Sequence, residues 1–390
     1  MVGAVSTSDA EYKQALIFDK ESPLYADIRI VKTDKKGKST EGNQLFNLSD
    51  LDVVSVAYKI QKDVISVIAE TKKGQKFIKE FENDSFDRFS GKVTFFAGNI
   101  GEAREAVTLL KKIIPLAEQK QLRSAPKLTD RFTAIQLLKK VNKTLTDKSG
   151  DIIQHFETAC TASLKVTRSG KGVTDEYYTF QVADLNDKKI VSDIKGSFFE
   201  IGLSTNNNQK VISYFKNDQR QNYTNSITLL SDNLEDFRYL PEALKKVIAD
   251  CKALEKSRVP AGSLSATMAW LEKQIPRLES DKVTINQSLT VSKDCSMKFT
   301  EERSDVKKSG ELVYEAGLKD LNVNAVNFDI SGKNVFVILM ANGKEKLIKT
   351  YKDGTPGNYT NEIRIQIDDV SIARDVTEGF KAVIKGCSGK

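Results

Sequence analysis

The triplet Asp50-Leu51-Asp52 recurs as Asp184-Leu185-Asn186 and again as Asp320-Leu321-Asn322. The same spacing carries further landmarks along the chain: Phe81 onto Phe215 and Tyr351, Phe89 onto Tyr223 and Tyr359, and Arg104 onto Arg238 and Arg374. Landmarks held at nearly constant spacing over this length of chain indicate an internal repeat. The sequence therefore predicts three tandem modules, at residues 1–122, 127–256 and 262–390, joined by segments 117–129 and 252–263.

Each copy shows the same order of elements. A helix leads, with apolar residues at helical spacing in 130–147 and 264–278 and a shorter version in 10–17. Alternating, strand-like runs follow, in the second copy near 153–167, 176–184, 190–203, 210–216 and 225–231. An amphipathic helix closes the module, and its apolar stripe in the third copy is Val376, Phe380, Val383 and Ile384. The predicted class is α+β, with three modules that each have one curved, mainly antiparallel sheet of five to six strands, a leading helix and a C-terminal packing helix.

The cysteines become interpretable through the repeat. The chain has four of them, Cys160, Cys251, Cys295 and Cys387. The repeat places the first and third in the opening strand of a module and the other two at the end of a closing helix. The first module carries Ala26 and Ala117 at these positions, so both members of the pair are missing together. This pattern predicts the disulfides Cys160–Cys251 and Cys295–Cys387, with four buried free thiols in a cytosolic protein as the alternative.

The charge and the hydropathy of the chain limit the classes of partner that we expect. Lys and Arg number 60 and Asp and Glu number 53, which gives a net charge of +7. The charge is spread along the chain rather than gathered on one element, so we expect no nucleic-acid partner. No apolar stretch reaches the length of a membrane span, so we expect no transmembrane segment. Bridged cysteines would place the protein in the periplasm, at the cell surface or outside the cell, with a signal peptide removed.

Residues able to carry catalysis are scarce. His155 is the only histidine, and its counterparts in the other copies are different residues, so we interpret it as a surface or edge-strand side chain. CxxC and HExxH patterns do not occur, so we expect neither a metal nor a cofactor. Acidic neighbours such as Glu301-Glu302 do not define a glycosidase pair, because such carboxylates must face each other across a cleft. We predict no catalytic residue and no enzyme.

One polar motif is repeated between two predicted strands. Asn222-Tyr223-Thr224-Asn225 recurs as Asn358-Tyr359-Thr360-Asn361, and Phe89 holds the Tyr position in the first copy. One interpretation is a turn whose ring packs back on the sheet. The other is a repeated contact loop, in which Tyr supplies rigid amphipathic area and Asn supplies hydrogen bonds.

Arg104, Arg238 and Arg374 are a second repeated feature, and they fall within the closing helices. They could form a shared contact site. We expect instead that each arginine ties its helix to its own module, near the aspartate that opens the repeated triplet.

The run from Asp320-Leu321-Asn322 through 334–339 and 349–354 to 368–374 resembles modules in uncharacterised exported proteins of Bacteroidetes-type bacteria. The resemblance implies export and tandem β-rich modules. It implies no reaction.

Three hypotheses for function follow. The leading one is a non-enzymatic exported protein, with a binding or structural role, whose three similar surfaces meet a protein partner, a surface polymer or copies of itself, as in a filament subunit. Repetition of a weak site raises avidity where the geometry allows simultaneous contact. The alternatives are a hydrolase that uses acidic residues in a cleft between modules and an intracellular adaptor of pleckstrin-like modules, in which a closing helix also follows a β-sheet.

Overall fold

The computed structural model describes residues 2–19, 24–62, 64–255, 258–260, 262–279, 283–305 and 309–388. The chain divides into two compact units. The first comprises Met1–Asp151, Ile190–Gly202 and Thr228–Lys246, and the second comprises Ile152–Lys189, Leu203–Ile227 and Val247–Lys390. The expected second module, 127–256, contributes residues to both units.

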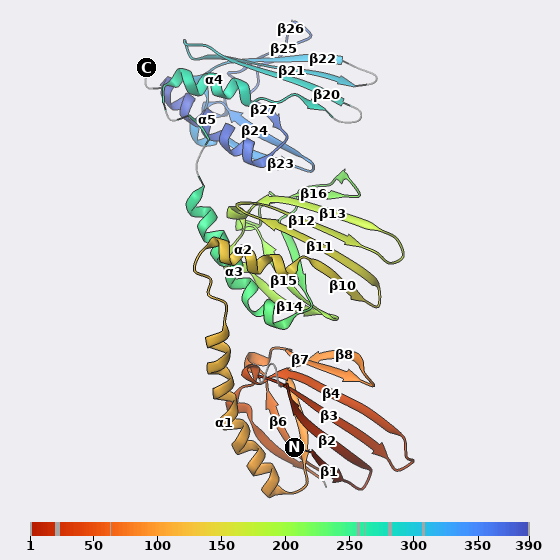
Figure 1. Cartoon of the computed structure of the whole chain (residues 1–390). Coiled ribbons are helices and arrows are strands. Elements are labelled where there is room, and N and C mark those ends of the chain that lie inside the picture. The colour runs from red at the N-terminus through yellow and green to blue at the C-terminus, as the bar shows by residue number, and fades with distance from the viewer. Residues whose placement is uncertain are drawn as a thin grey trace. The chain divides into compact units, whose positions relative to one another are not determined.

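The described strands form three pairs of antiparallel sheets, and the strand order is the same in each pair (Figure 1). Every pair has a six-stranded sheet and a three-stranded sheet. The first six-stranded sheet is built from β1 (Val2–Ser6), β2 (Ala10–Phe18), β3 (Tyr25–Asp34), β4 (Ser39–Asn47), β7 (Ile78–Glu82) and β8 (Ser85–Ser90). Its three-stranded companion is built from β5 (Ala57–Gln61), β6 (Val64–Glu70) and β9 (Lys92–Ala97).

The other two pairs repeat this order. The second pair comprises β10 (Lys143–Asp147), β11 (Gly150–Thr158), β12 (Thr161–Arg168), β13 (Thr174–Gln181), β16 (Ser213–Lys216) and β17 (Gln219–Arg220), with β14 (Val191–Lys195), β15 (Phe198–Ser204) and β18 (Ser226–Ser231). The third comprises β19 (Leu278–Glu279), β20 (Val283–Val291), β21 (Ser296–Asp305), β22 (Ser309–Gly317), β25 (Lys349–Lys352) and β26 (Thr355–Pro356), with β23 (Asn327–Ser331), β24 (Asn334–Met340) and β27 (Glu362–Ile367). We call each recurrence of this order a repeat.

A long helix follows each three-stranded sheet: α1 (Ile100–Ser124), α3 (Leu234–Leu254) and α5 (Val370–Ser388). Two shorter helices, α2 (Arg131–Leu138) and α4 (Leu264–Gln274), precede the second and third six-stranded sheets. Each larger sheet leads to its smaller one through a short 3-10 helix: η1 (Leu48–Asp50), η5 (Val182–Asp184) and η8 (Leu318–Asp320). These three turns hold the first residue of the repeated triplet.

The predicted α+β class was wrong. The described chain is mainly β, and each repeat has two antiparallel sheets where the prediction had one sheet of five to six strands. The prediction did not divide the strands between two sheets. In the structure β7 pairs with β4 in the larger sheet, whereas β9 pairs with β6 in the smaller one. Hydrophobic alternation identifies a strand, but it does not say which sheet the strand joins.

Of the predicted leading helices, the one in 264–278 is present as α4, the one in 130–147 was too long, and the one in 10–17 was wrong. Residues 10–17 lie in strand β2, which pairs with β3 along its whole length and with β1 over residues 11–15. In 130–147 the α-helix ends at Leu138 and a strand begins at Lys143. Leu145, which lies within the predicted helix, is buried on that strand, while Phe132 is 69% exposed. The β-branched Thr144 and Thr146 favour the extended conformation there.

The closing helix of the third repeat packs as its pattern predicted. Val376, Phe380, Val383 and Ile384 are buried in one core cluster with residues of β24 and β27. The helix lies against the smaller sheet of its own repeat (Figure 1). This packing fixes the orientation of every other side chain on α5.

A glutamine joins the two sheets within a repeat. The Gln14 side chain exchanges hydrogen bonds with the backbone of Phe96, donating to its carbonyl and accepting from its N–H at 2.9 Å. Gln287 does the same with Gln366, at 2.8 Å and 3.1 Å. Gln154, the fifth residue of β11 as Gln14 and Gln287 are of β2 and β20, is buried. One amide side chain thus takes the place of a strand pairing between sheets.

Candidate functional site

The candidate site in the first unit begins with a buried aspartate. Asp50 ends η1, whose first turn is capped by Asn47: the Ser49 N–H donates to the Asn47 side-chain oxygen at 2.9 Å. Leu48 and Leu51 are buried on either side of this turn. The apolar anchors hold the Asp50 carboxylate in a place where only 5% of the side chain is exposed.

Arg238 is the partner of Asp50. It is the fifth residue of α3, and its two terminal nitrogens donate to the two carboxylate oxygens of Asp50. The guanidinium carbon lies 5.3 Å from the centroid of the Phe77 ring. Two parallel, charge-assisted hydrogen bonds are the strongest form of such a pair and fix its geometry. Both residues belong to the first unit.

A second carboxylate extends the network. Glu235 accepts from Arg238 Nε at 3.0 Å, from the Tyr25 hydroxyl at 2.5 Å, from Asn47 at 3.1 Å and from Gln121 at 2.8 Å. Burial alone would raise the pKa of Glu235, but the hydrogen bond from Tyr25 and the charge of Arg238 hold it below its ordinary value. Burial and the bond to Glu235 raise the pKa of Tyr25, which keeps this hydroxyl a donor.

Burial raises the pKa of Asp50, and the hydrogen bonds and charge of Arg238 oppose that effect only in part. The charge of Arg238 is secured by Asp50 and Glu235 together, which raise its own pKa against the effect of burial. The contact is therefore a single positive group held between two acids. It is built to hold elements together, because every polar atom of its carboxylates is already engaged.

The same contact recurs in the second unit. Asp184 ends η5, and Arg374 is the fifth residue of α5; its Nη2 lies 2.6 Å from Asp184 Oδ1. Glu255 is a more distant second acid, 3.8 Å from Arg374. The other oxygen of Asp184 is buried without a hydrogen-bond partner among the described atoms. Burial raises the pKa of Asp184, and Arg374 opposes that rise.

The expectation that each arginine ties its helix to its own module was wrong. Arg238 and Arg374 both pair with the aspartate of the preceding repeat. The reason lies one position earlier in the helices, where Phe237 and Ala373 are buried against their own repeat. Successive helical residues point about 100° apart, so the arginine that follows faces away from that core.

In the predicted repeated contact loop, the threonines and asparagines make hydrogen bonds within their own repeat. Its backbone forms an isolated antiparallel bridge and not the expected turn: Thr224 exchanges hydrogen bonds with Ile212, and Thr360 does so with Ile348. The side chains of Asn225 and Asn361 donate to turn carbonyls, at 3.4 Å to Asn208 and 3.2 Å to Lys344. Asn358 contributes a carbonyl that accepts from Thr350 at 2.6 Å.

The aromatic residue of the loop is buried in two copies and exposed in the third. Phe89 is buried, and its ring centroid lies 4.9 Å from that of Phe199 in the next repeat. Tyr223 is buried too, and its N–H donates to Gly332 of the next repeat at 3.2 Å. Tyr359 is 51% exposed. Asn222 also comes close to Gly332, where an added Cβ would lie 3.4 Å from the Asn222 side-chain oxygen.

Both predicted disulfides are present, Cys160–Cys251 and Cys295–Cys387. The pairing is confirmed, but the assigned counterpart in the first repeat was wrong by two residues. The Val182 N–H donates to Cys160 and the Leu318 N–H to Cys295, each at 2.8 Å; the matching bond in the first repeat is to Leu24, not Ala26. The two cysteines precede β12 and β21 instead of lying in strands. In the first unit Leu24 and Ala117 are both buried in the core.

A cavity of about 900 Å³ in the second unit tests the hydrolase alternative. Each of its four acidic lining residues lies in an ion pair: Glu255 with Arg374, Asp329 with Arg364, Asp375 with Arg258 and Glu378 with Lys381. Each of these acids therefore already faces a cation. His155 is exposed beside Glu157, at 3.0 Å, and is not among the residues that line this cavity.

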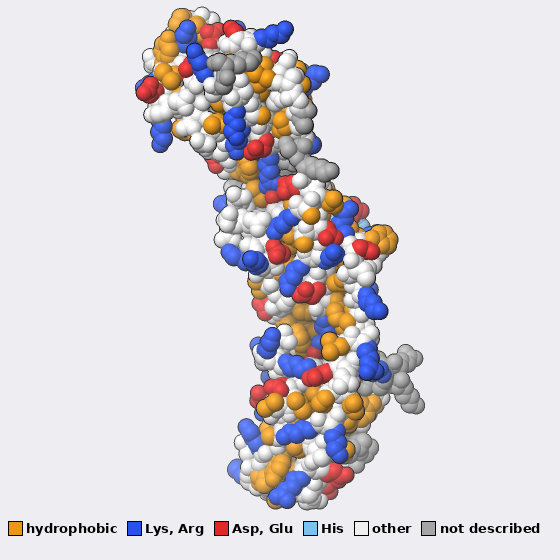
Figure 2. Space-filling model, turned by 90° about the vertical axis from the view of Figure 1, so that its left-hand side faces the viewer, with side chains coloured by type: hydrophobic (Ala, Val, Ile, Leu, Met, Phe, Trp, Pro, Cys, Tyr) orange, Lys and Arg blue, Asp and Glu red, His pale blue; other side chains and the backbone are white. Residues whose placement is uncertain are grey.

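Further observations bear on ligands. Within the described ranges, no cluster of three His, Cys, Asp or Glu residues is placed to hold a metal ion. Lys and Arg are interspersed with Asp and Glu on the face drawn in Figure 2. That face therefore carries no extended field of one sign.

None of the described helices combines the length and apolar character needed to cross a membrane. Searches of protein-family models and of curated proteins found no match to this chain. The functional argument therefore rests on the contacts described above.

Proposed function

We propose that the protein is an exported, non-enzymatic structural or binding protein that acts through one repeated contact surface. The observation that carries this proposal is the Asp50–Arg238 pair and its recurrence as Asp184–Arg374. In both cases the end of a 3-10 turn meets the fifth residue of the next long helix. A contact used twice within one chain is a contact that the fold presents at every repeat.

The disulfides support export. Bridges of this kind persist in oxidising compartments and are rare in the reducing cytosol. We therefore place the protein in the periplasm, at the cell surface or outside the cell. The same bridges weigh against the adaptor alternative, which needs a cytosolic location, and the ion-paired acids of the large cavity weigh against the hydrolase.

The partner class follows from the chemistry of the surface. In the third repeat, the half-buried carboxylate of Asp320 and the exposed ring of Tyr359 suit a protein surface that supplies a guanidinium and apolar area. A surface polymer remains an outcome of the test, because tyrosine and asparagine also bind sugars through stacking and hydrogen bonds.

The test uses the full chain in the cells that make it. Thiols are alkylated before reduction, and an amine-reactive cross-linker is applied to intact cells before peptide mapping. We expect four unmodified cysteines in an exported fraction and cross-links from the third repeat to another polypeptide. Readily alkylated thiols in a cytosolic fraction, or hydrolysis of a surface polymer by the purified chain, would contradict the proposal.

A further inference from the structure

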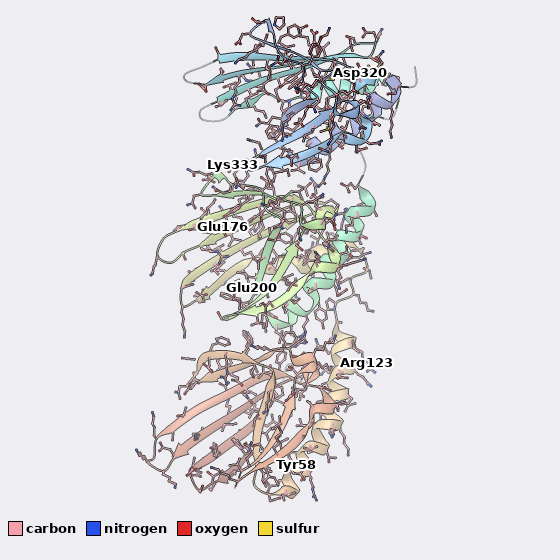
Figure 3. All side chains as sticks on the ribbon, turned by 180° about the vertical axis from the view of Figure 1, so that it is seen from behind. Tyr58, Arg123, Glu176, Glu200, Asp320 and Lys333 are labelled. Carbon is pink, nitrogen blue, oxygen red and sulfur yellow. A yellow bond between two sulfur atoms is a disulfide. The ribbon has the colours of Figure 1, made fainter. Side chains whose placement is uncertain are left out.

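One aspartate and one arginine at the positions of the repeated contact have no ion-pair partner among the described residues. Arg104 is the fifth residue of α1, equivalent to Arg238 and Arg374, and it is exposed. Asp320 ends η8, equivalent to Asp50 and Asp184, and it is half-buried where η8 packs against α5 (Figure 3). Across the part of the chain that the structure describes, neither has an ion-pair partner, while the four equivalent residues are all paired.

The surroundings of Asp320 match those that receive α3 in the first unit. A cavity of about 460 Å³ is lined by Asp320, Leu347 and Lys349. The corresponding cavity in the first unit is about 250 Å³, and Phe77 and Lys79 line it at the equivalent positions. That smaller cavity is also lined by Asp232, Asn233 and Leu234, where α3 begins. In the third repeat no helix start is among the lining residues.

Other members of this surface are also uncovered. Tyr359, the equivalent of the buried Phe89 and Tyr223, is exposed, and so is Leu347. Phe77, at the position of Leu347, lies against the Arg238 guanidinium in the first unit. We call Asp320, Leu347, Lys349 and Tyr359 the aspartate surface. It has the carboxylate, the apolar floor and the aromatic residue of the two occupied contacts.

The start of α1 carries the complementary set. Ile100 opens α1 and is exposed, whereas the residues that open α3 and α5, Leu234 and Val370, are buried. Ile60 in β5 is 52% exposed, whereas Ile330, at the same place in β23, packs against the core of the second unit. We call Arg104, Ile100 and Ile60 the arginine surface. In the third repeat both equivalent apolar residues, Val370 and Ile330, are covered.

We propose that the aspartate surface binds the arginine surface of a second copy of this chain, with Asp320 paired to Arg104. This inference rests on the proposed function and names its partner. The charges decide the orientation, because two aspartate surfaces or two arginine surfaces brought together would leave like charges unpaired and desolvated. The contact is therefore head-to-tail, and a head-to-tail contact continues from copy to copy until it closes a ring or forms a filament.

The second copy is the occupant that the chain itself specifies. The Asp–Arg contact is already used twice within the chain, so the surfaces are complementary by construction. Lys79 extends this match: its ammonium donates to the Asp232 carbonyl at 3.4 Å, just before α3. Lys349, at the same position in the third repeat, would meet the equivalent carbonyl of Gly98, just before α1 of the second copy.

The experiment measures self-association of the full, disulfide-bonded chain by sedimentation velocity over a range of concentrations. Asp320→Arg and Arg104→Asp should each weaken association about thirtyfold or more, because each places like charges at the centre of the contact. An equimolar mixture of the two variants should associate again, since Arg at position 320 then meets Asp at position 104. Glu302→Arg and Lys111→Asp are matched charge changes at exposed positions and should leave association unchanged.

The outcomes are distinct. Recovery in the mixture supports the proposal and shows that both variants are folded. Association that is unchanged in both single variants, or a wild-type chain that stays monomeric at the highest concentration, overturns it. A monomeric chain that still forms cross-links to another polypeptide on cells would leave the proposed function in place and remove only the second copy as partner.

Discussion

Arg238 donates to both carboxylate oxygens of Asp50, although 188 residues separate the two along the chain. Only 14% of the arginine side chain and 5% of the aspartate side chain are exposed. A buried pair of this kind stabilises only while both partners remain, because either charge left alone in the interior is costly. The pair therefore determines which surfaces of the fold can meet.

Replacing Asp50 by Asn should lower the free energy of unfolding by about 3 kcal/mol, because the buried Arg238 charge loses its bidentate partner and keeps only Glu235. Urea denaturation followed by circular dichroism measures the change. Adding Arg238→Met should recover part of the loss, since the unpaired guanidinium is then gone and Glu235 keeps its hydrogen bonds from Tyr25, Asn47 and Gln121. Asp87→Asn, at an exposed position, should change stability by less than about 0.5 kcal/mol. A D50N variant as stable as D87N would show that the pair contributes nothing.

Asp184→Asn should cost less than Asp50→Asn, about 2 kcal/mol. Asp184 accepts from Arg374 through one oxygen, and its other oxygen is buried without a partner among the described atoms. The substitution therefore removes fewer hydrogen bonds than Asp50→Asn does. The same urea experiment, run on both variants side by side, ranks them. A larger loss for D184N would mean that the single hydrogen bond in the second unit is the stronger contact.

Acid should weaken the first unit through Glu235. Its pKa is lowered from the ordinary value of 4.5, so its contribution to stability is present above that value and is lost as pH falls through the lowered pKa. Glu235→Gln should therefore be less stable than the wild type at pH 6, and the difference should shrink below about pH 4. Thermal unfolding at a series of pH values measures it. Asp50, whose pKa is raised, contributes with the opposite sign, so its share is largest in acid and falls as pH rises.

Replacing Cys160 and Cys251 by Ser should cost about 4–5 kcal/mol in the chain-entropy account, because their bridge closes a loop with a sequence separation of 91 residues. Urea denaturation of the double variant and of the wild type, each with and without reductant, provides the measurement. Reductant should still destabilise the variant through the remaining bridge, Cys295–Cys387. A variant that matches the oxidised wild type in stability would show that the loop closure has no net effect.

Gln287→Met should cost about 1–3 kcal/mol, because it leaves the N–H and C=O of Gln366 without their partners between the two sheets. Gln366→Met is the matched control. It keeps those backbone groups and removes only an exposed hydrogen bond from its own side chain to Asn334. Hydrogen exchange of the backbone amide at position 366 reports the local effect in both variants. Equal protection in the two variants would show that Gln287 does not hold the sheets together.

The repeat and the cysteine pairing were accessible from the sequence. Matching landmarks at fixed spacing reveal a repeat without any knowledge of contacts, and cysteines at two equivalent positions reveal their partners. The contact loop was not accessible. Thr224 and Thr360 form bridges to distant strands where a turn was expected, and burial of Tyr223 and exposure of Tyr359 depend on whether another repeat covers them.

The candidate site was not accessible. Arg238 and Asp50 were each marked by the repeat, yet their pairing crosses from one repeat to the next. A periodic pattern shows which face of a helix is apolar, but it does not show what lies opposite the polar face. The two-sheet arrangement was missed for a similar reason, because alternation is the same for a strand in either sheet.

The sequence by itself determined that the chain repeats three times and that Cys160 pairs with Cys251 and Cys295 with Cys387. Both follow from the spacing of residues along the chain, which the sequence gives without any knowledge of contacts. Only the tertiary structure decided that the arginine of one repeat binds the aspartate of the repeat before it. That choice depends on packing: the buried stripe of each closing helix points the arginine away from its own core, and no local pattern encodes the surface that it then meets.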